Sequence, residues 1–94
     1  MKVVFSDLAR QRLHEIQSYI AFHNIRAAEK VVDRIIYAVE VLGDHPELGP
    51  IWPPGLTRAF AVSGLPYRIH YRINAAESCI EVITVAHTSQ LPPV

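Results

Sequence analysis

Cysteine is nearly absent from this 94-residue chain, in which Cys79 stands alone. A single thiol excludes an internal disulfide and is typical of a reducing compartment, and the chain has no Cys-x-x-Cys pair or cysteine–histidine cluster that would predict a metal site. No apolar run reaches the length of a membrane span, and the first seven residues lack the apolar stretch of a signal peptide. We therefore expect a cytoplasmic protein that uses no metal or cofactor.

Net charge is missing as well, because nine basic and nine acidic residues cancel. A neutral chain is not steered toward nucleic acid by its overall field, so attraction to an acidic partner must come from a local patch. Neutrality also favours association, and we expect a partner chain. Half of the residues are hydrophobic, which is enough for one small core, and we predict a single domain over residues 1–94.

Acidic residues are locally absent where the arginines gather. The 29 residues 48–76 contain no Asp or Glu, and within them a seven-residue run alternates strictly between apolar and cationic side chains. On a strand this alternation sends Arg68, His70 and Arg72 to one face and tyrosines and isoleucines to the other. We expect the first set to form an open cationic face, joined by Arg58 from the neighbouring strand, that contacts phosphates or carboxylates. The alternative is a solvated sheet face without a function.

Two helices are predicted in the first half. Ser6 is a suitable N-cap, and apolar residues then recur every three or four positions as far as a break at His23-Asn24. Asn24 is the expected cap of a second helix with the same spacing, which should end at Gly43. The short connection predicts an antiparallel helical hairpin.

Four strands are expected around this hairpin. Proline and glycine punctuate Asp44 to Gly55, which we predict to be a loop whose Trp52 folds back onto the body. The predicted strands are Val3–Phe5, Thr57–Val62, Tyr67–Ile73 and Cys79–His87. Short connections predict antiparallel neighbours. The expected fold class is α+β, in the order β-α-α-β-β-β, with the hairpin on one face of a small, mainly antiparallel sheet.

Histidines are the candidate catalytic groups. His70 and His87 fall in predicted strands and are able to act as general acid or base near neutral pH, although alternation alone leaves the facing of His87 open. No nucleophile elbow or Ser-His-Asp pattern indicates a conventional hydrolase. Cleavage of RNA through its own 2′-hydroxyl stays open, because it needs only a base, an acid and cations around one phosphate.

Apolar parts of the hairpin and of the sheet edge are left without a partner in the expected fold. They predict a groove that binds another chain.

A resemblance to a known family is carried by segments that occur in order along nearly the whole chain: Ser6, Tyr19-Ile20-Ala21, Asn24, Ala27-Ala28, His45-Pro46-Glu47-Leu48-Gly49, Thr57-Arg58, Gly64-Leu65-Pro66-Tyr67-Arg68-Ile69, Tyr71-Arg72 and Val85-Ala86-His87. Together they resemble the ParE-like branch of the RelE/ParE toxin superfamily. The resemblance implies the toxin of a bacterial type II toxin–antitoxin pair. It also implies a ParD-like antitoxin that wraps the hairpin and the sheet and neutralises the toxin in a hetero-oligomer.

The resemblance leaves two targets. ParE-like members are associated with poisoning DNA gyrase, and RelE-like members with cleaving mRNA on the ribosome through a cluster of Lys, Arg and a late Tyr or His. No lysine follows Lys30 and no tyrosine follows Tyr71, which disfavours the ribonuclease. We expect a gyrase inhibitor that acts by binding and not as an enzyme, through Arg58, Arg68, Arg72 and His87. In the alternative, an mRNA endonuclease, His70 or His87 is the acid or base.

A third alternative is an attenuated toxin that keeps only antitoxin binding. The family often ends in His-x-x-Arg, and Gln90 stands where that arginine is expected. The residues expected to contact the antitoxin are Leu13, Ile20, Val32, Ile36, Val39 and Trp52.

Overall fold

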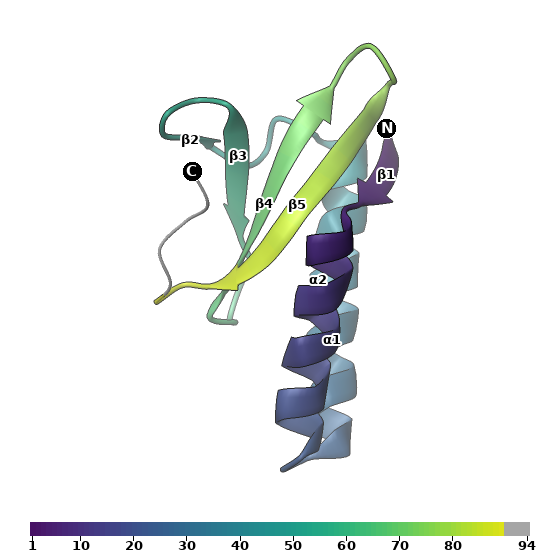
Figure 1. Ribbon diagram of the computed structural model, residues 1–94, viewed down its shortest axis with the longest axis vertical. Helices are drawn as coiled ribbons and strands as arrows, with labels where there is room; N and C mark the ends of the chain where they lie inside the picture. The colour runs from purple at the N-terminus through teal and green to yellow at the C-terminus, as the bar shows by residue number, and fades with distance from the viewer. Residues whose placement is uncertain (90–94) are drawn as a thin grey trace.

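Two antiparallel helices pack along one face of a five-stranded sheet and extend beyond its lower end (Figure 1). The computed structural model describes residues 1–89. Its elements are β1 (Lys2–Phe5), α1 (Asp7–Ala21), α2 (Ile25–Asp44), β2 (Ile51–Trp52), β3 (Thr57–Ala61), β4 (Tyr67–Asn74) and β5 (Cys79–His87). The predicted α+β class and the hairpin on one sheet face are confirmed. Neither helix is long and apolar enough to cross a membrane.

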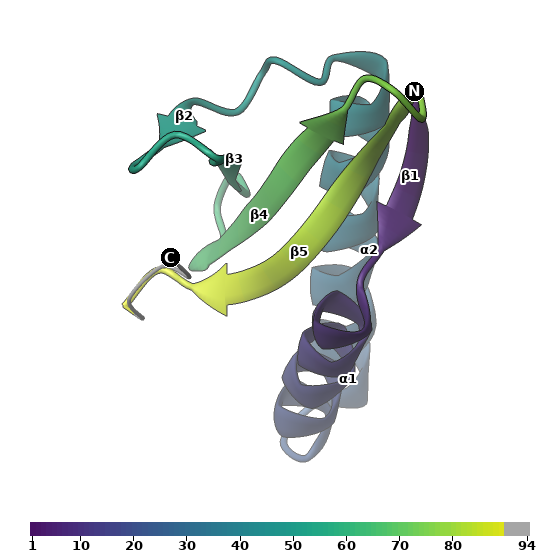
Figure 2. The same cartoon turned by 45° about the horizontal axis from the view of Figure 1, so that its top comes forward.

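The strand order is β1-β5-β4-β3-β2, so the first strand lies beside the last (Figure 2). β1 runs parallel to β5, and every other pair in the described sheet is antiparallel. β2 is an element that the sequence did not predict, because the segment from Asp44 to Gly55 was expected to be loop throughout. It is only two residues long and forms the edge opposite β1.

Both predicted helix caps are present. The Ser6 hydroxyl accepts from the Ala9 amide at 3.0 Å, and the Asn24 side-chain oxygen accepts from the Ala27 amide at 3.0 Å. These bonds satisfy amide groups that have no partner within the helix. The Ser6 hydroxyl also donates to the Ile83 carbonyl at 2.6 Å, which ties the start of α1 to β5.

Gly43 does not end the second helix as predicted. α2 continues to Asp44, and the N-terminal ammonium group donates to the Gly43 carbonyl at 2.5 Å. A Cβ at this position would lie 3.0 Å from the Met1 carbonyl oxygen and 3.2 Å from a methyl group of Val3. The glycine therefore permits close packing of β1 on α2.

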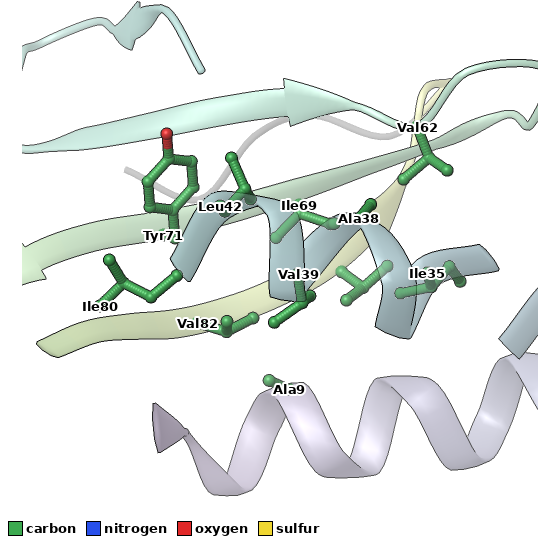
Figure 3. Packing of buried hydrophobic residues seen from close by; sticks show 11 residues of the cluster. Ala9, Ile35, Ala38, Val39, Leu42, Val62, Ile69, Tyr71, Ile80 and Val82 are labelled. Carbon is green, nitrogen blue, oxygen red and sulfur yellow. The ribbon is translucent and has the colours of Figure 1, made fainter. Parts of the chain in front are cut away.

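The core lies between the sheet and the hairpin (Figure 3). α2 contributes Ile35, Val39 and Leu42, which face apolar side chains from β4 and β5. Ala9 of α1 is fully buried, and its small side chain allows α1 to approach the same cluster. Burial of such side chains supplies the main favourable free energy of folding.

Tyr71 is the core residue with a polar anchor. Its ring is fully buried, while its hydroxyl donates to the Pro46 carbonyl at 2.6 Å and accepts from the Gly49 amide at 2.9 Å. A Cβ on Gly49 would lie 2.7 Å from that hydroxyl oxygen, so the close approach requires glycine. Tyr71 thereby fixes the path of the segment that leads into β2.

A β-bulge changes the facing of residues along β5. His70 pairs with Thr84 and Tyr71 with Val82, so Ile83 is an extra residue on β5. Residues on the two sides of this bulge therefore do not follow one alternation. His87, opposite Tyr67, lies on the helix side of the sheet, whereas Glu81, opposite Arg72, lies on the other side.

We predict that Tyr71→Phe lowers the free energy of unfolding by about 1–3 kcal/mol, because the buried Gly49 amide loses its acceptor. The measurement is urea denaturation of the purified chain. Tyr67→Phe is the matched control and should cost less than about 0.5 kcal/mol, since no described residue bonds to its hydroxyl. Equal losses in the two variants would contradict the anchoring role of Tyr71.

Candidate functional site

The outer face of the sheet, defined as the side that carries Arg68, His70 and Arg72, is turned away from the helices. Alternation along β4 places these three residues there, as predicted. Arg58 does not join them, because it pairs with Tyr71 and its side chain leaves on the helix side. Its guanidinium donates to the Gly49 carbonyl at 2.8 Å and to the Glu47 carbonyl at 3.2 Å. The prediction that Arg58 extends the cationic row is therefore wrong.

Trp52 covers part of the outer face. The guanidinium carbon of Arg68 lies 4.8 Å from the centre of the Trp52 ring, a cation–π geometry, and the His70 ring meets the indole edge-on at 5.4 Å. Trp52 thus folds back onto the body as predicted. His70 is fully buried as a result of the packing around it, so the prediction that all three residues of the row are open to solvent is wrong.

His70 is held in its neutral form. Neither ring nitrogen has a hydrogen-bond partner within residues 1–89. Burial, with a smaller contribution from the positive charge of Arg68, lowers the pKa of His70 below its ordinary value. A neutral ring without access to solvent is a poor acid or base for a macromolecular substrate.

Arg72 has an acidic partner that the local sequence did not reveal. Its guanidinium forms an ion pair with Glu81, the opposite residue on β5, and the same carboxylate accepts from the Asn74 amide group at 3.1 Å. The prediction that Arg72 has no acidic neighbour is wrong, because the carboxylate of Glu81 comes from an adjacent strand outside residues 48–76.

Arg58 and Arg72 nevertheless both border one hollow. They line the arginine hollow, a concave site of about 260 Å³ between the β2–β3 hairpin and the end of β4. Its other lining residues are Ile51, Gly55, Leu56, Thr57 and Ile73. Two arginines line this shallow hollow, and arginine side chains can bind an anionic oxygen group such as a phosphate or a carboxylate.

His87 lies apart from this hollow, on the helix side. Its ring meets Tyr67 edge-on at 5.7 Å, and its Nδ1 lies 2.7 Å from the Ser89 hydroxyl. With Tyr67 it lines the α1 cleft, a space of about 180 Å³ that also contacts Arg12, Glu15, Ile16, Tyr19 and Val85. Sequence reasoning missed the α1 residues, because only the packing of α1 on β5 brings them to His87.

The residues predicted to contact an antitoxin differ in accessibility. Val39 is only 2% exposed and lies in the core, so it offers no surface to a partner, and its inclusion was wrong. The other five are partly exposed: Leu13, Ile20, Val32, Ile36 and Trp52. No group of three or more His, Cys, Asp or Glu side chains within residues 1–89 is arranged to hold a metal ion.

The sequence matches the family model of the ParE toxin of the type II toxin–antitoxin system parDE over residues 3–92. The chain belongs to the ParE toxin family. A protein of Sinorhizobium fredii named "Putative toxin Y4kP" is 38% identical over 85 residues, which cover 90% of this chain and 85% of that protein. The match reaches Gln90, which lies outside the described residues.

Solved structures of toxin–antitoxin systems share the fold of this ParE family member. A chain from the chromosomal ParDE system of P. aeruginosa superposes with a TM-score of 0.79 at 18% identity, covering 93% of this chain and 95% of that one. A chain from the toxin–antitoxin complex RelBE2 of Mycobacterium tuberculosis gives a TM-score of 0.69 at 19% identity, covering 92% and 95%. The recognition of the RelE/ParE superfamily from the sequence is thereby confirmed.

We predict that the stability of the ParE chain falls as the pH drops below about 6.5, because the folded state resists protonation of His70 and the unfolded state does not. Each further unit by which the pH falls should lower the free energy of unfolding by up to about 1.4 kcal/mol, until the lowered pKa of His70 is passed. His70→Leu should flatten the dependence and keep full stability at pH 7.5, since its nitrogens have no described partner. Thermal melts from pH 7.5 to 5 measure the effect, with His14→Leu as an exposed control; equal slopes in wild type and His70→Leu would contradict the assignment.

Proposed function

We propose that this toxin inhibits DNA gyrase by binding, without bond-making chemistry of its own, and that a cognate antitoxin neutralises it. Membership of the ParE family supports the class of target. The observation that carries the mode of action is the separation of the charged and titratable groups. Arg58 and Arg72 share the arginine hollow, whereas the two candidate acid–base histidines lie on opposite faces of the sheet.

Cleavage of RNA needs a base and an acid close to the same phosphate. His70 is buried and neutral on the outer face, and His87 lies in the α1 cleft on the helix side. His70 and His87 are therefore not placed to act together on one substrate. The arginine hollow can instead bind an anionic group of the target and hold it, which requires charge and shape alone.

The ribonuclease alternative rests on the α1 cleft. There His87 has Tyr67 and Arg12 as neighbours, which supplies one titratable ring and one cation. Such a site would work through His87 and not through His70.

The attenuated toxin remains the third proposal, and it depends on Gln90, which lies outside the described residues.

An antitoxin partner is supported by the apolar surface of the hairpin. Tyr19, Phe22 and Tyr37 are between 69% and 85% exposed, and Ile25 is 67% exposed. Large apolar side chains that stay exposed favour an interface with another chain. Both structural neighbours come from toxin–antitoxin systems, which agrees with a partner of this kind.

We predict that the purified chain blocks gyrase supercoiling of a relaxed plasmid and leaves translated mRNA intact. Arg72→Gln should raise the concentration for half-inhibition at least about tenfold, because a charge-assisted contact from the arginine hollow is lost. Arg10→Gln is the matched control, since Arg10 is also an exposed arginine paired with one carboxylate, and it should change inhibition by less than about twofold.

A different result would support the ribonuclease. If gyrase keeps its activity while mRNA is cut at specific positions, and if His87→Ala abolishes the cuts without loss of fold, the binding mechanism is wrong. Absence of growth arrest on induction without the antitoxin would support the attenuated toxin.

A further inference from the structure

The arginine hollow has an apolar rim beside its charged residues. Ile51 and Leu56, on either side of the turn between β2 and β3, are 62% and 78% exposed, and Ile73 of β4 lines the hollow with them. Exposed aliphatic side chains gain free energy when a partner covers them. The volume of about 260 Å³ lies below the range of about 300–1,000 Å³ that is typical of small-molecule pockets. The hollow therefore suits one or two side chains of another polypeptide better than a whole small ligand.

The arginines of this region are already engaged by groups of the chain itself. The Arg58 guanidinium donates to two backbone carbonyl groups, and the Arg72 guanidinium pairs with Glu81. Farther along β4, Arg68 lies over the Trp52 ring. Binding to a nucleic-acid strand depends on several cations that neutralise successive phosphates. Engaged arginines beside an apolar rim favour a single carboxylate on a polypeptide over a nucleic acid.

The ion pair with Glu81 shows that Arg72 holds a carboxylate in this position. Oxygen Oε1 of Glu81 accepts from the Arg72 guanidinium and, at 3.1 Å, from the Asn74 amide group. The Arg72 and Glu81 side chains are 52% and 33% exposed, so a second carboxylate can approach the pair from solvent. An ion pair at this exposure contributes little to stability. A carboxylate that arrives with a partner can therefore take the place of Glu81.

Asn74 limits the cost of this exchange. Its bond to Oε1 does not involve Arg72, so Glu81 keeps one hydrogen bond and its contact with water when Arg72 changes partner. The released carboxylate is thus not left buried and unpaired, which would carry a desolvation penalty. Burial of Ile51 and Leu56 by the partner then supplies favourable free energy for binding.

We propose that the arginine hollow binds an acidic side chain of a gyrase polypeptide, flanked by apolar residues, and that this side chain replaces Glu81 as the partner of Arg72. The inference rests on the proposed function and specifies the chemical class of ligand that the hollow takes. In the free toxin, Glu81 then competes with the target for Arg72 and lowers the affinity of the hollow. A DNA phosphate is the competing occupant.

The first experiment measures the affinity of the full chain for purified gyrase by biolayer interferometry, after thermal melts establish that each variant is folded. Glu81→Gln keeps the size of the side chain and removes the charge that competes for Arg72. We expect it to tighten binding about two- to fivefold, the range that an exposed ion pair is worth.

Glu77→Gln is the matched control for this measurement. It removes one negative charge from the exposed turn between β4 and β5, and Glu77 belongs to none of the ion pairs within residues 1–89. Because salt screens exposed charges that are not in contact, it should change the affinity by less than about 1.5-fold.

The second experiment identifies what the hollow contacts. Leu56→p-benzoylphenylalanine places a photoreactive ring at the rim, and its adducts with gyrase bound to a DNA fragment are digested and mapped by mass spectrometry. We expect adducts on a gyrase polypeptide, in a segment where Asp or Glu is flanked by apolar residues. Tyr19→p-benzoylphenylalanine is the control, since Tyr19 is exposed but outside the hollow, and it should give no adduct on that segment.

The outcomes separate this inference from the proposed function. Weaker binding by Glu81→Gln, or a change equal to that of Glu77→Gln, overturns the exchange at Arg72. Adducts on DNA alone, or no adduct from residue 56 while gyrase stays inhibited, overturn the polypeptide ligand. If the wild-type chain neither binds nor inhibits gyrase, the proposed function itself is wrong.

Discussion

The contact between the Tyr71 hydroxyl and the segment 46–49 organises the chain that leads into β2 and covers part of the outer face of the sheet. The Tyr71 hydroxyl donates to the Pro46 carbonyl and accepts from the Gly49 amide, which holds this segment under the sheet. The Arg58 guanidinium adds bonds to the Glu47 and Gly49 carbonyls of the same segment. The chain that emerges at Pro50 is then in place to form β2 and to lay Trp52 over the outer face. The buried Tyr71 hydroxyl both donates and accepts a hydrogen bond. Its loss would release the segment 46–49 and, with it, the position of Trp52 over the outer face.

Local chemistry explains why much of the fold could be predicted. Helix caps at Ser6 and Asn24 and the apolar spacing behind them act within a few residues, so the sequence alone is informative. The strict alternation in β4 likewise fixed which side chains share a face. Gly43 was misjudged because its small size serves contact with the N-terminal strand, and a distant contact leaves no local signal.

The candidate site was harder to predict, since several of its errors came from strand register. Arg58 was assigned to the wrong face because its partner on β4 was unknown, and the carboxylate of Glu81 was missed for the same reason. The bulge at Ile83 decides that His87 faces the helices, and no alternation pattern within β5 contains that information. His70 was expected to be open, but the two-residue strand β2, which has almost no sequence signature, brings Trp52 across it. Residues that meet only through tertiary packing, such as Arg12 and His87, lie beyond what periodicity can reveal.

Trp52 is the only tryptophan in the chain, so its fluorescence reports on the lid that Tyr71 is held to position. The most direct test compares emission and acrylamide quenching of wild type and Tyr71→Phe under conditions where both remain folded by circular dichroism. If the Tyr71 hydroxyl organises this region, the variant should emit at longer wavelength and be quenched more strongly, because Trp52 leaves Arg68 and His70. Identical spectra and identical quenching would contradict the account.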